Sequence, residues 1–336
     1  MALIPVRVAG MRWAALLALA TVLVTAACEA ETGAKGGADR PTQGTPGTPT
    51  KTPQKPERVP EKVAGIPTKA GTHVLKLDFG GPLGRQYRLR VPPRLAGGRW
   101  RDGRPARPLP LVVAMHGGAA NAAQMERLSG FNRVADREGV LVAYPEGFMF
   151  SWNAGFCCGP AKLANSDDVG FVTELVRTLT EAGLADRRRV YATGFSNGAG
   201  MAYRLACEAP GTFAAIGVVA AAMAMKRCDP APTSVLIMHG TADRNVPYHG
   251  GGRRDFNDSR PFPPVSHAVD YWRKVNGLPP PRRALTVAGG PDCRTSGKGE
   301  AGTEVALCRI EGGGHVWPKG AQNTIWAFFD ANPRRR

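Results

Sequence analysis

The feature that most constrains this chain is a pentapeptide with a serine at its centre, Gly194-Phe-Ser-Asn-Gly198. A short apolar run typical of a strand, 189–193, precedes it, and a run of small residues typical of a helix, 199–206, follows it. Glycines remove the side chains that would collide in a tight strand-to-helix turn. We therefore predict that Ser196 lies at the tip of such a turn, just beyond the end of a strand.

Two further polar residues follow strand-like runs downstream of Ser196. Asp243 comes after the apolar run 233–238, and His315 comes after the run 305–310 and three glycines. A nucleophilic serine needs a base, and the base needs an acid to orient it. Taken singly, Asp243 has the ordinary interpretation of a turn residue and His315 that of a surface histidine. Their order after the serine predicts a catalytic triad of Ser196, Asp243 and His315.

An apolar strand candidate at 110–115 ends in the segment His116-Gly-Gly-Ala-Ala120. Glycines allow backbone N–H groups to face an oxyanion that develops during acyl transfer. We expect those N–H donors to come from Gly117, Gly118, Ala119 and the residue after the serine, Asn197. The histidines of these motifs, His116 and His239, are interpreted as structural.

Together these motifs resemble the secreted polyhydroxybutyrate depolymerase and feruloyl esterase family of α/β-hydrolases. The resemblance covers roughly residues 70–333 and includes Ser151-Trp-Asn153, Cys157-Cys-Gly159 and Asp167-Asp-Val-Gly-Phe171. It implies hydrolysis of carboxylic esters through an acyl-enzyme, without a cofactor or metal, in a polyhydroxybutyrate depolymerase-like reaction. A feruloyl or acetyl xylan-type carbohydrate esterase is the alternative. A surface-tethered binding protein that has lost catalysis is an alternative of another class, which the intact triad disfavours.

The chain from 68 to 336 alternates strand-like and helix-like segments. After a possible hairpin at 73–79 and 85–91, we expect strands at 110–115, 139–144, 189–193, 215–220, 233–238 and 303–310. Helices are expected near 121–137, 168–184, 197–208, 263–275 and 321–331. This alternation predicts one α/β catalytic domain with the α/β-hydrolase fold, a mainly parallel, doubly wound sheet.

The first 67 residues carry signals for export. Residues 1–27 combine two arginines with an uncharged apolar stretch, as in a signal peptide. The segment before Cys28 resembles a bacterial lipobox, with Thr25 where leucine is more usual. Cys28 is therefore a lipidation candidate, with plain secretion as the alternative. Residues 28–67, rich in Pro, Thr and Gly, are expected to be a disordered linker. We expect an extracellular monomer, anchored to the membrane by lipid or secreted.

The six cysteines other than Cys28 form an even set in an exported chain, so we expect disulfides. Cys293 and Cys308 flank a glycine-rich connection and are candidates for one bond. Cys228 follows the strand at 215–220, near the same edge as the loop carrying Cys157 and Cys158, and we expect it to pair with one of them. The remaining cysteine, Cys207, has the interpretation of a buried free thiol.

The formal net charge of +17 invites a nucleic-acid interpretation. We do not adopt it, because the arginines are spread over loops and no nucleic-acid module is recognisable. No metal site is expected either, since the six histidines are scattered. In an exported protein this charge suits anionic polymers of the cell envelope.

Two tryptophans and one loop are candidates for substrate contact. Trp152 and Trp317 are interpreted either as core residues or as walls of the substrate pocket. The irregular loop 145–165, rich in aromatic residues and glycine, is the expected specificity element. Asp167 and Asp168 precede a helix-like run and are interpreted as N-terminal caps.

Overall fold

The computed structural model describes residues 59–335, except 156, 226–227, 253–260 and 286–291. The signal peptide, Cys28 and most of the linker expected from the sequence lie outside the described residues. The last residues assigned to that linker form a small antiparallel hairpin of β1 (Lys62–Val63) and β2 (Ile66–Pro67). Ile66 is buried in the core of the domain. The folded part of the chain thus begins a few residues before 68.

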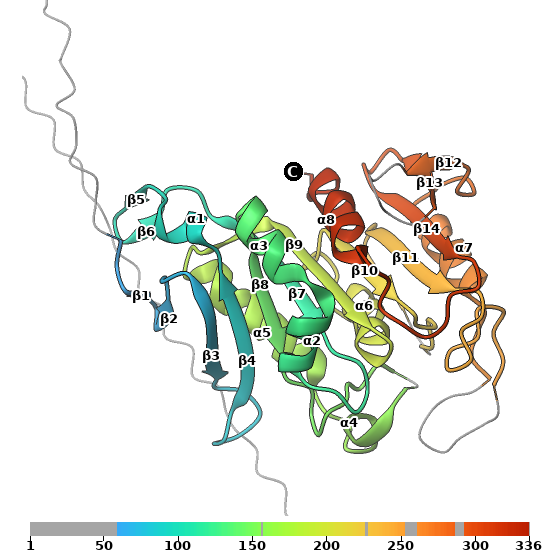
Figure 1. The fold of residues 1–336 in the computed structure, drawn as a ribbon, viewed down its shortest axis with the longest axis horizontal. Helices are drawn as coiled ribbons and strands as arrows, with labels where there is room; N and C mark the ends of the chain where they lie inside the picture. The colour runs from blue at the N-terminus through green and yellow to red at the C-terminus, as the bar shows by residue number, and fades with distance from the viewer. Residues whose placement is uncertain (1–58, 156, 226–227, 253–260, 286–291, 336) are drawn as a thin grey trace, which may run out of the picture. The chain divides into compact units, whose positions relative to one another are not determined.

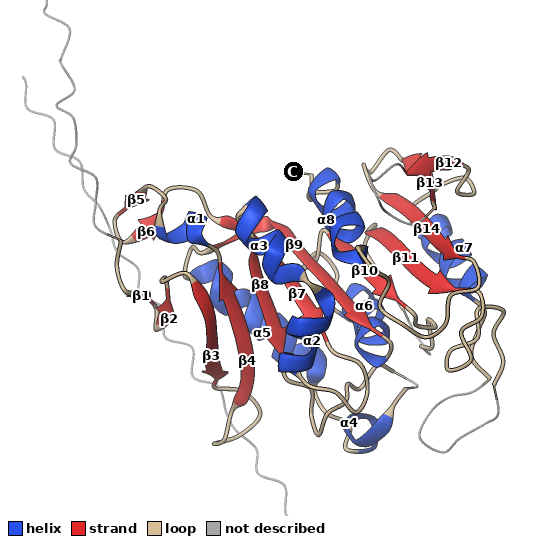
Figure 2. Ribbon diagram, viewed as in Figure 1, coloured by secondary structure: helices blue, strands red, loops and turns tan. Residues whose placement is uncertain are grey.

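A ten-stranded sheet runs through the described part of the chain (Figures 1 and 2). Its strands, in spatial order, are β12 (Arg283–Leu285), β13 (Cys293–Lys298), β14 (Glu304–Ile310), β11 (Ser234–Gly240), β10 (Ala215–Val219), β9 (Ala185–Phe195), β7 (Leu109–Met115), β8 (Leu141–Pro145), β4 (Arg85–Val91) and β3 (Gly71–Leu77). From β14 to β8 all neighbours are parallel, and both edges are antiparallel. The mainly parallel sheet of an α/β-hydrolase fold is confirmed.

Helices cover both faces of this sheet. Leu111 and Val113 of β7 belong to the apolar cluster beneath α5 (Asp168–Glu181), α6 (Asn197–Glu208) and α7 (Val265–Val275). Val112 and Ala114 belong to the cluster beneath α2 (Ala122–Ser129), α3 (Phe131–Glu138) and α8 (Ala321–Ala331). Successive strand residues therefore face opposite layers, and all seven residues of β7 are buried.

Short elements complete the fold and modify one expectation. The helix expected near 121–137 is two helices, because Gly130 adopts a left-handed conformation with φ of 71° between α2 and α3. The hairpin of β5 (Trp100–Arg101) and β6 (Arg104–Pro105) and the short helices α1 (Pro93–Ala96) and α4 (Gly159–Leu163) were not expected. Within the described residues, no helix is both long enough and apolar enough to cross a membrane.

Three disulfides join the six described cysteines. Cys293 pairs with Cys308 across β13 and β14, as expected. The expectations of a Cys228 bond to Cys157 or Cys158 and of a free thiol at Cys207 were wrong, because Cys228 pairs with Cys207, and Cys157 pairs with Cys158. Cys207 lies in the last turn of α6, and the chain beyond β10 returns past that turn, which brings the two Cα atoms within 4.7 Å.

Candidate active site

The serine of the pentapeptide occupies a strained turn between β9 and α6. Ser196 has φ of 52° and ψ of −119°, a combination that a non-glycine residue rarely adopts. A Cβ atom on Gly194 would lie 2.4 Å from the carbonyl carbon of Gly198, and one on Gly198 would lie 2.3 Å from the carbonyl oxygen of His116. Both glycines are therefore required for the turn to close against the end of β7.

Ser196, His315 and Asp243 lie together at the carboxyl ends of β9, β14 and β11. The Ser196 Oγ is 2.9 Å from His315 Nε2, and His315 Nδ1 is 2.8 Å from Asp243 Oδ2. An Nδ1–H donor to the carboxylate leaves Nε2 with a lone pair that can accept the serine hydroxyl. The Phe195 ring packs 4.9 Å from the imidazole, centroid to centroid. The three residues form one continuous line of hydrogen bonds.

Asp243 is buried and held by several donors. Its Oδ1 accepts the backbone N–H groups of Asn245 and Val246, each at 2.8 Å. Its Oδ2 is also 3.3 Å from Nε2 of His239, which lies 2.8 Å from the carbonyl oxygen of Val246. Burial acts to raise the pKa of Asp243, but the hydrogen bonds from His239, His315 and Val246 outweigh it. The pKa therefore lies well below its usual value, and the carboxylate stays ionised.

The glycine segment after β7 lies against the serine turn. A Cβ atom on Gly117 would lie 3.6 Å from Cβ of Ser196, and one on Gly118 would lie 3.7 Å from Cβ of Asn197. Among the described residues, no acceptor is hydrogen-bonded to the N–H groups of Gly117, Gly118 or Asn197. The expectation for Ala119 was wrong, since its N–H donates to the carbonyl oxygen of Phe150 at 2.9 Å.

His116 holds the glycine segment in place through two hydrogen bonds of its ring. Its Nδ1 donates to the carbonyl oxygen of Gly117 at 2.8 Å, and its Nε2 accepts the N–H of Gly147 at 2.9 Å. Burial lowers the pKa of His116, which keeps the ring neutral and suits this pattern of one donor and one acceptor. The structural interpretation of His116 agrees with these contacts.

Trp152 does not form a wall of the substrate pocket. Its side chain is fully buried, and its indole N–H donates to the carbonyl oxygen of His116 at 2.9 Å. The Asn197 amide holds the backbone of Trp152 with two hydrogen bonds, 2.7 Å to its N–H and 2.9 Å to its carbonyl oxygen. Trp152 therefore links the 145–165 loop to the serine turn.

Trp317 also lies away from the space next to the serine. Its ring packs edge-on against Phe131, with centroids 6.4 Å apart, and borders the apolar cluster under α3 and α8. Of the two interpretations of these tryptophans, core residue and pocket wall, the contacts of both agree with the first.

The cavity beside Ser196 has a volume of about 230 Å³. Apart from Ser196, Asn197 and His315, its described lining is mostly small or apolar: Ala154, Cys157, Cys158, Gly200, Ala221, Ala222, Asn245, Val246 and Phe262. Phe262 is the one aromatic residue in this lining. The cavity thus offers an apolar space next to the hydroxyl of Ser196.

A buried ion pair fixes the loop that borders this cavity. Asp168 is fully buried; its Oδ1 is 2.7 Å from Nη1 of Arg85, and its Oδ2 accepts the N–H of Asn153 at 2.7 Å. The capping interpretation was wrong for Asp168 and right for Asp167, whose side chain accepts the N–H of Gly170 at 2.8 Å. Sequence reasoning missed Arg85, which lies 83 residues from its partner.

Comparisons with known proteins identify the family of this chain. The family described as "Esterase PHB depolymerase" matches residues 100–245. "Putative esterase NocK" from Nocardia uniformis subsp. tsuyamanensis is 34% identical over 254 residues, which are 70% of this chain and 71% of that protein. "Feruloyl esterase B" from Piromyces equi is 30% identical over 231 residues, which are 65% of this chain but only 41% of that protein.

A solved structure supports the fold alone. The acetyl xylan esterase from Aspergillus awamori superimposes with a TM-score of 0.53 at 16% identity, covering 78% of this chain and 100% of that one.

Proposed function

Because the chain belongs to the PHB depolymerase family of esterases, and is therefore a carboxylic ester hydrolase, we propose that Ser196 is its nucleophile. The observation that carries this proposal is the line of hydrogen bonds from Ser196 through His315 to the ionised Asp243. A binding protein without catalysis would have no need of this line, which disfavours the inactive alternative.

The mechanism follows from the positions of these groups. His315 Nε2 takes the hydroxyl proton as Ser196 Oγ attacks the ester carbonyl, and Asp243 stabilises the imidazolium that forms. The free N–H groups of Gly117, Gly118 and Asn197 are the candidate donors to the tetrahedral oxyanion. The imidazolium then protonates the leaving alkoxide, which departs as an alcohol. Water, activated by the same histidine, releases the acid and restores the serine.

The lining of the cavity favours an aliphatic acyl group. The apolar side chains of this lining can contact a short alkanoyl or hydroxyalkanoyl chain. They are those of Ala154, Ala221, Ala222 and Val246. A feruloyl group remains the second candidate, because the feruloyl esterase of Piromyces equi is 30% identical to this chain and Phe262 could contact an aromatic ring. We propose polyhydroxybutyrate oligomers or similar short-chain esters as the preferred substrates.

Purified protein should hydrolyse p-nitrophenyl butyrate, and Ser196→Ala should abolish the activity. Ser266→Ala, an exposed serine on α7, is the matched control and should retain full activity. A fluorophosphonate should add to Ser196, as located by mass spectrometry of the digested protein. Undiminished hydrolysis by the Ser196→Ala variant would refute the assignment. Comparing release of 3-hydroxybutyrate from its oligomers with release of ferulate from methyl ferulate then separates the two substrate classes.

We also propose that the chain is exported and anchored through a lipid on Cys28. This rests on the sequence of the first 28 residues, outside the described structure. In a bacterial host that processes lipoproteins, esterase activity should appear in the membrane fraction. Cys28→Ala should move it away from that fraction, and an unchanged distribution would contradict the proposal.

A further inference from the structure

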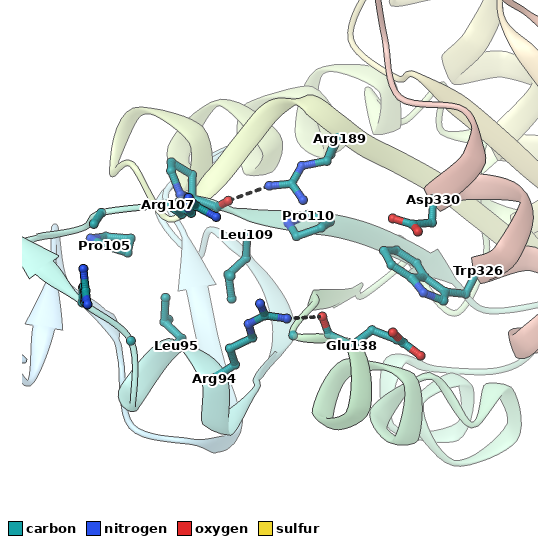
Figure 3. A pocket seen from close by; sticks show the side chains of 15 residues that line it. Arg94, Leu95, Pro105, Arg107, Leu109, Pro110, Glu138, Arg189, Trp326 and Asp330 are labelled. Atoms are coloured by element: carbon teal, nitrogen blue, oxygen red, sulfur yellow. Dashed lines mark hydrogen bonds between the residues drawn. The ribbon is translucent and has the colours of Figure 1, made fainter.

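A second cavity, of about 530 Å³, lies at the opposite end of the sheet from Ser196. Figure 3 shows this second cavity from close by. It borders the amino ends of β7 and β9, at Leu109 and Arg189, whereas Ser196 follows the carboxyl end of β9. Seven residues of extended strand separate Arg189 from Ser196, a distance of about 20 Å. The two cavities share no lining residue. The second cavity is therefore separate from the esterase site.

Four arginines line this cavity, and two of them are held in place by the protein. Arg189 Nε is 2.8 Å from Asp186 Oδ2, and its Nη2 donates to the carbonyl oxygen of Pro108 at 2.9 Å. The side chain of Arg94 crosses Gly139, where a Cβ atom would lie 2.4 Å from its Cδ, and its Nη1 donates to the carbonyl oxygen of Glu138 at 3.4 Å. These contacts direct two guanidinium groups along the cavity (Figure 3).

The other two arginines are brought together by the β5–β6 hairpin. Arg99 and Arg107 flank that hairpin, and the N–H of Ala106 donates to the carbonyl oxygen of Arg99 at 2.8 Å. The hairpin is fixed from below by Trp100, which is buried and donates to the carbonyl oxygen of Leu95. Among the described residues, neither Arg99 nor Arg107 has a carboxylate within ion-pair distance. The hairpin thus presents to the cavity two guanidinium groups that have no carboxylate partner among the described residues.

The floor of the cavity is apolar, and its far end is acidic. Leu95, Leu109 and Trp326 line it and are buried to nine-tenths or more. Glu138 and Asp330 lie toward the end with Trp326, away from Arg107 (Figure 3). Glu138 is already paired with Arg137 at 2.6 Å. The cavity therefore combines four guanidinium groups and an apolar floor with carboxylate acceptors at the end beside Trp326.

We propose that this cavity binds a small organic carboxylate with an apolar body and a hydroxyl group at its far end. Guanidinium groups bind carboxylates through paired, charge-assisted hydrogen bonds, which suits Arg99 and Arg107. The hydroxyl would donate to Asp330, while Leu109 and Trp326 would cover the apolar part. A polyanion fits less well, because Glu138 and Asp330 would repel a second charge. The proposal does not rest on the role assigned to Ser196.

Calorimetric titration of the protein with free acids, which carry no ester bond for it to hydrolyse, tests this site. The probes are 4-hydroxycinnamate and 3-hydroxybutyrate, with the neutral amide 4-hydroxycinnamide as the ligand control. At least one acid should bind with one-to-one stoichiometry, and the amide should not. Arg99→Gln and Arg107→Gln should each raise the Kd at least about tenfold. Arg127→Gln, an exposed arginine on α2 that lines neither cavity, should leave it unchanged.

Hydrolysis of p-nitrophenyl butyrate by the Arg99→Gln and Arg107→Gln proteins shows that these variants fold. Binding of neither acid would overturn the proposal. Binding that survives both arginine substitutions but is blocked by a phosphonyl group on Ser196 would also overturn it, since the acid would then occupy the esterase site. Equal or tighter binding of inorganic phosphate or of a polyglycerol phosphate would overturn the choice of ligand in favour of a phosphate site.

Discussion

Replacing Asn197 with alanine removes the two hydrogen bonds that join the 145–165 loop to the serine turn. The amide of Asn197 satisfies both the N–H and the carbonyl oxygen of Trp152, and all three groups lie in the interior. A buried polar group left without a partner costs about 1–3 kcal/mol. We expect Asn197→Ala to lower the free energy of unfolding by about 3 kcal/mol.

The expected change can be measured as a melting temperature. A domain of this size unfolds with an entropy of roughly 0.6 kcal/mol/K, so a loss of this magnitude lowers Tm by about 5 °C. The effect on catalysis should fall mainly on KM. The backbone N–H of Asn197 stays at the start of α6, and the bonds among Ser196, His315 and Asp243 are unaffected. The loop bordering the cavity loses its attachment, so KM for p-nitrophenyl butyrate rises while kcat falls less than tenfold.

Asn132→Ala is a matched control. The Asn132 amide also makes two hydrogen bonds, to Glu126 and to the hydroxyl of Tyr144, but Asn132 does not line the cavity beside Ser196. It should lower Tm without changing KM. Calorimetry and steady-state kinetics on the two variants together test the reasoning. A Tm for Asn197→Ala within 1 °C of the parent protein, or an equal rise in KM for Asn132→Ala, would refute it.

Three further predictions follow from the site, a disulfide and a buried tyrosine. Asp243→Asn should lower kcat about 10⁴-fold, because an asparagine amide no longer orients the His315 ring so that its Nε2 is free to take the serine proton. A decrease of less than tenfold in the p-nitrophenyl butyrate assay would argue against the triad. Replacing Cys293 and Cys308 with serine removes a disulfide that closes a loop with a sequence separation of 15. The free energy of unfolding should fall by about 3 kcal/mol, with kcat unchanged. An unaltered midpoint of urea unfolding would contradict this. Burial raises the pKa of Tyr87 from 10.0 to about 12. The stability that comes from burying the neutral phenol is therefore complete below pH 10 and is lost as the pH rises through 12. Tyr87→Phe should therefore make the loss of stability between pH 10 and 12 smaller by up to about 3 kcal/mol, and identical alkaline unfolding curves would disprove this effect.

The sequence predicted the features of the site that depend on local chain geometry. Ser196, Asp243 and His315 each come within a few residues of the end of an apolar run, and the carboxyl ends of parallel strands meet at one edge. Any correct assignment of the strands therefore brings the three residues near one another. The same holds for Cys293 and Cys308, which face each other across an antiparallel pair.

Features that depend on contacts between distant segments could not be predicted in this way. The N–H of Ala119 donates a hydrogen bond to the carbonyl oxygen of Phe150. Cys207 pairs with Cys228 only because the chain beyond β10 returns past the end of α6. Asp168 has the sequence context of a helix cap, yet its partner Arg85 lies on β4. In each case the local pattern allows two outcomes, and packing between segments selects one.

The strained backbone of Ser196 sets the stability of the fold against the proposed chemistry. A non-glycine residue with φ of 52° and ψ of −119° is held at a cost of order 1–3 kcal/mol. Glycine would relieve that cost, but Ser196→Gly would remove the proposed nucleophile. Serine at this position is therefore accounted for by the proposed chemistry and not by stability. A descendant released from its catalytic role should lose this residue early.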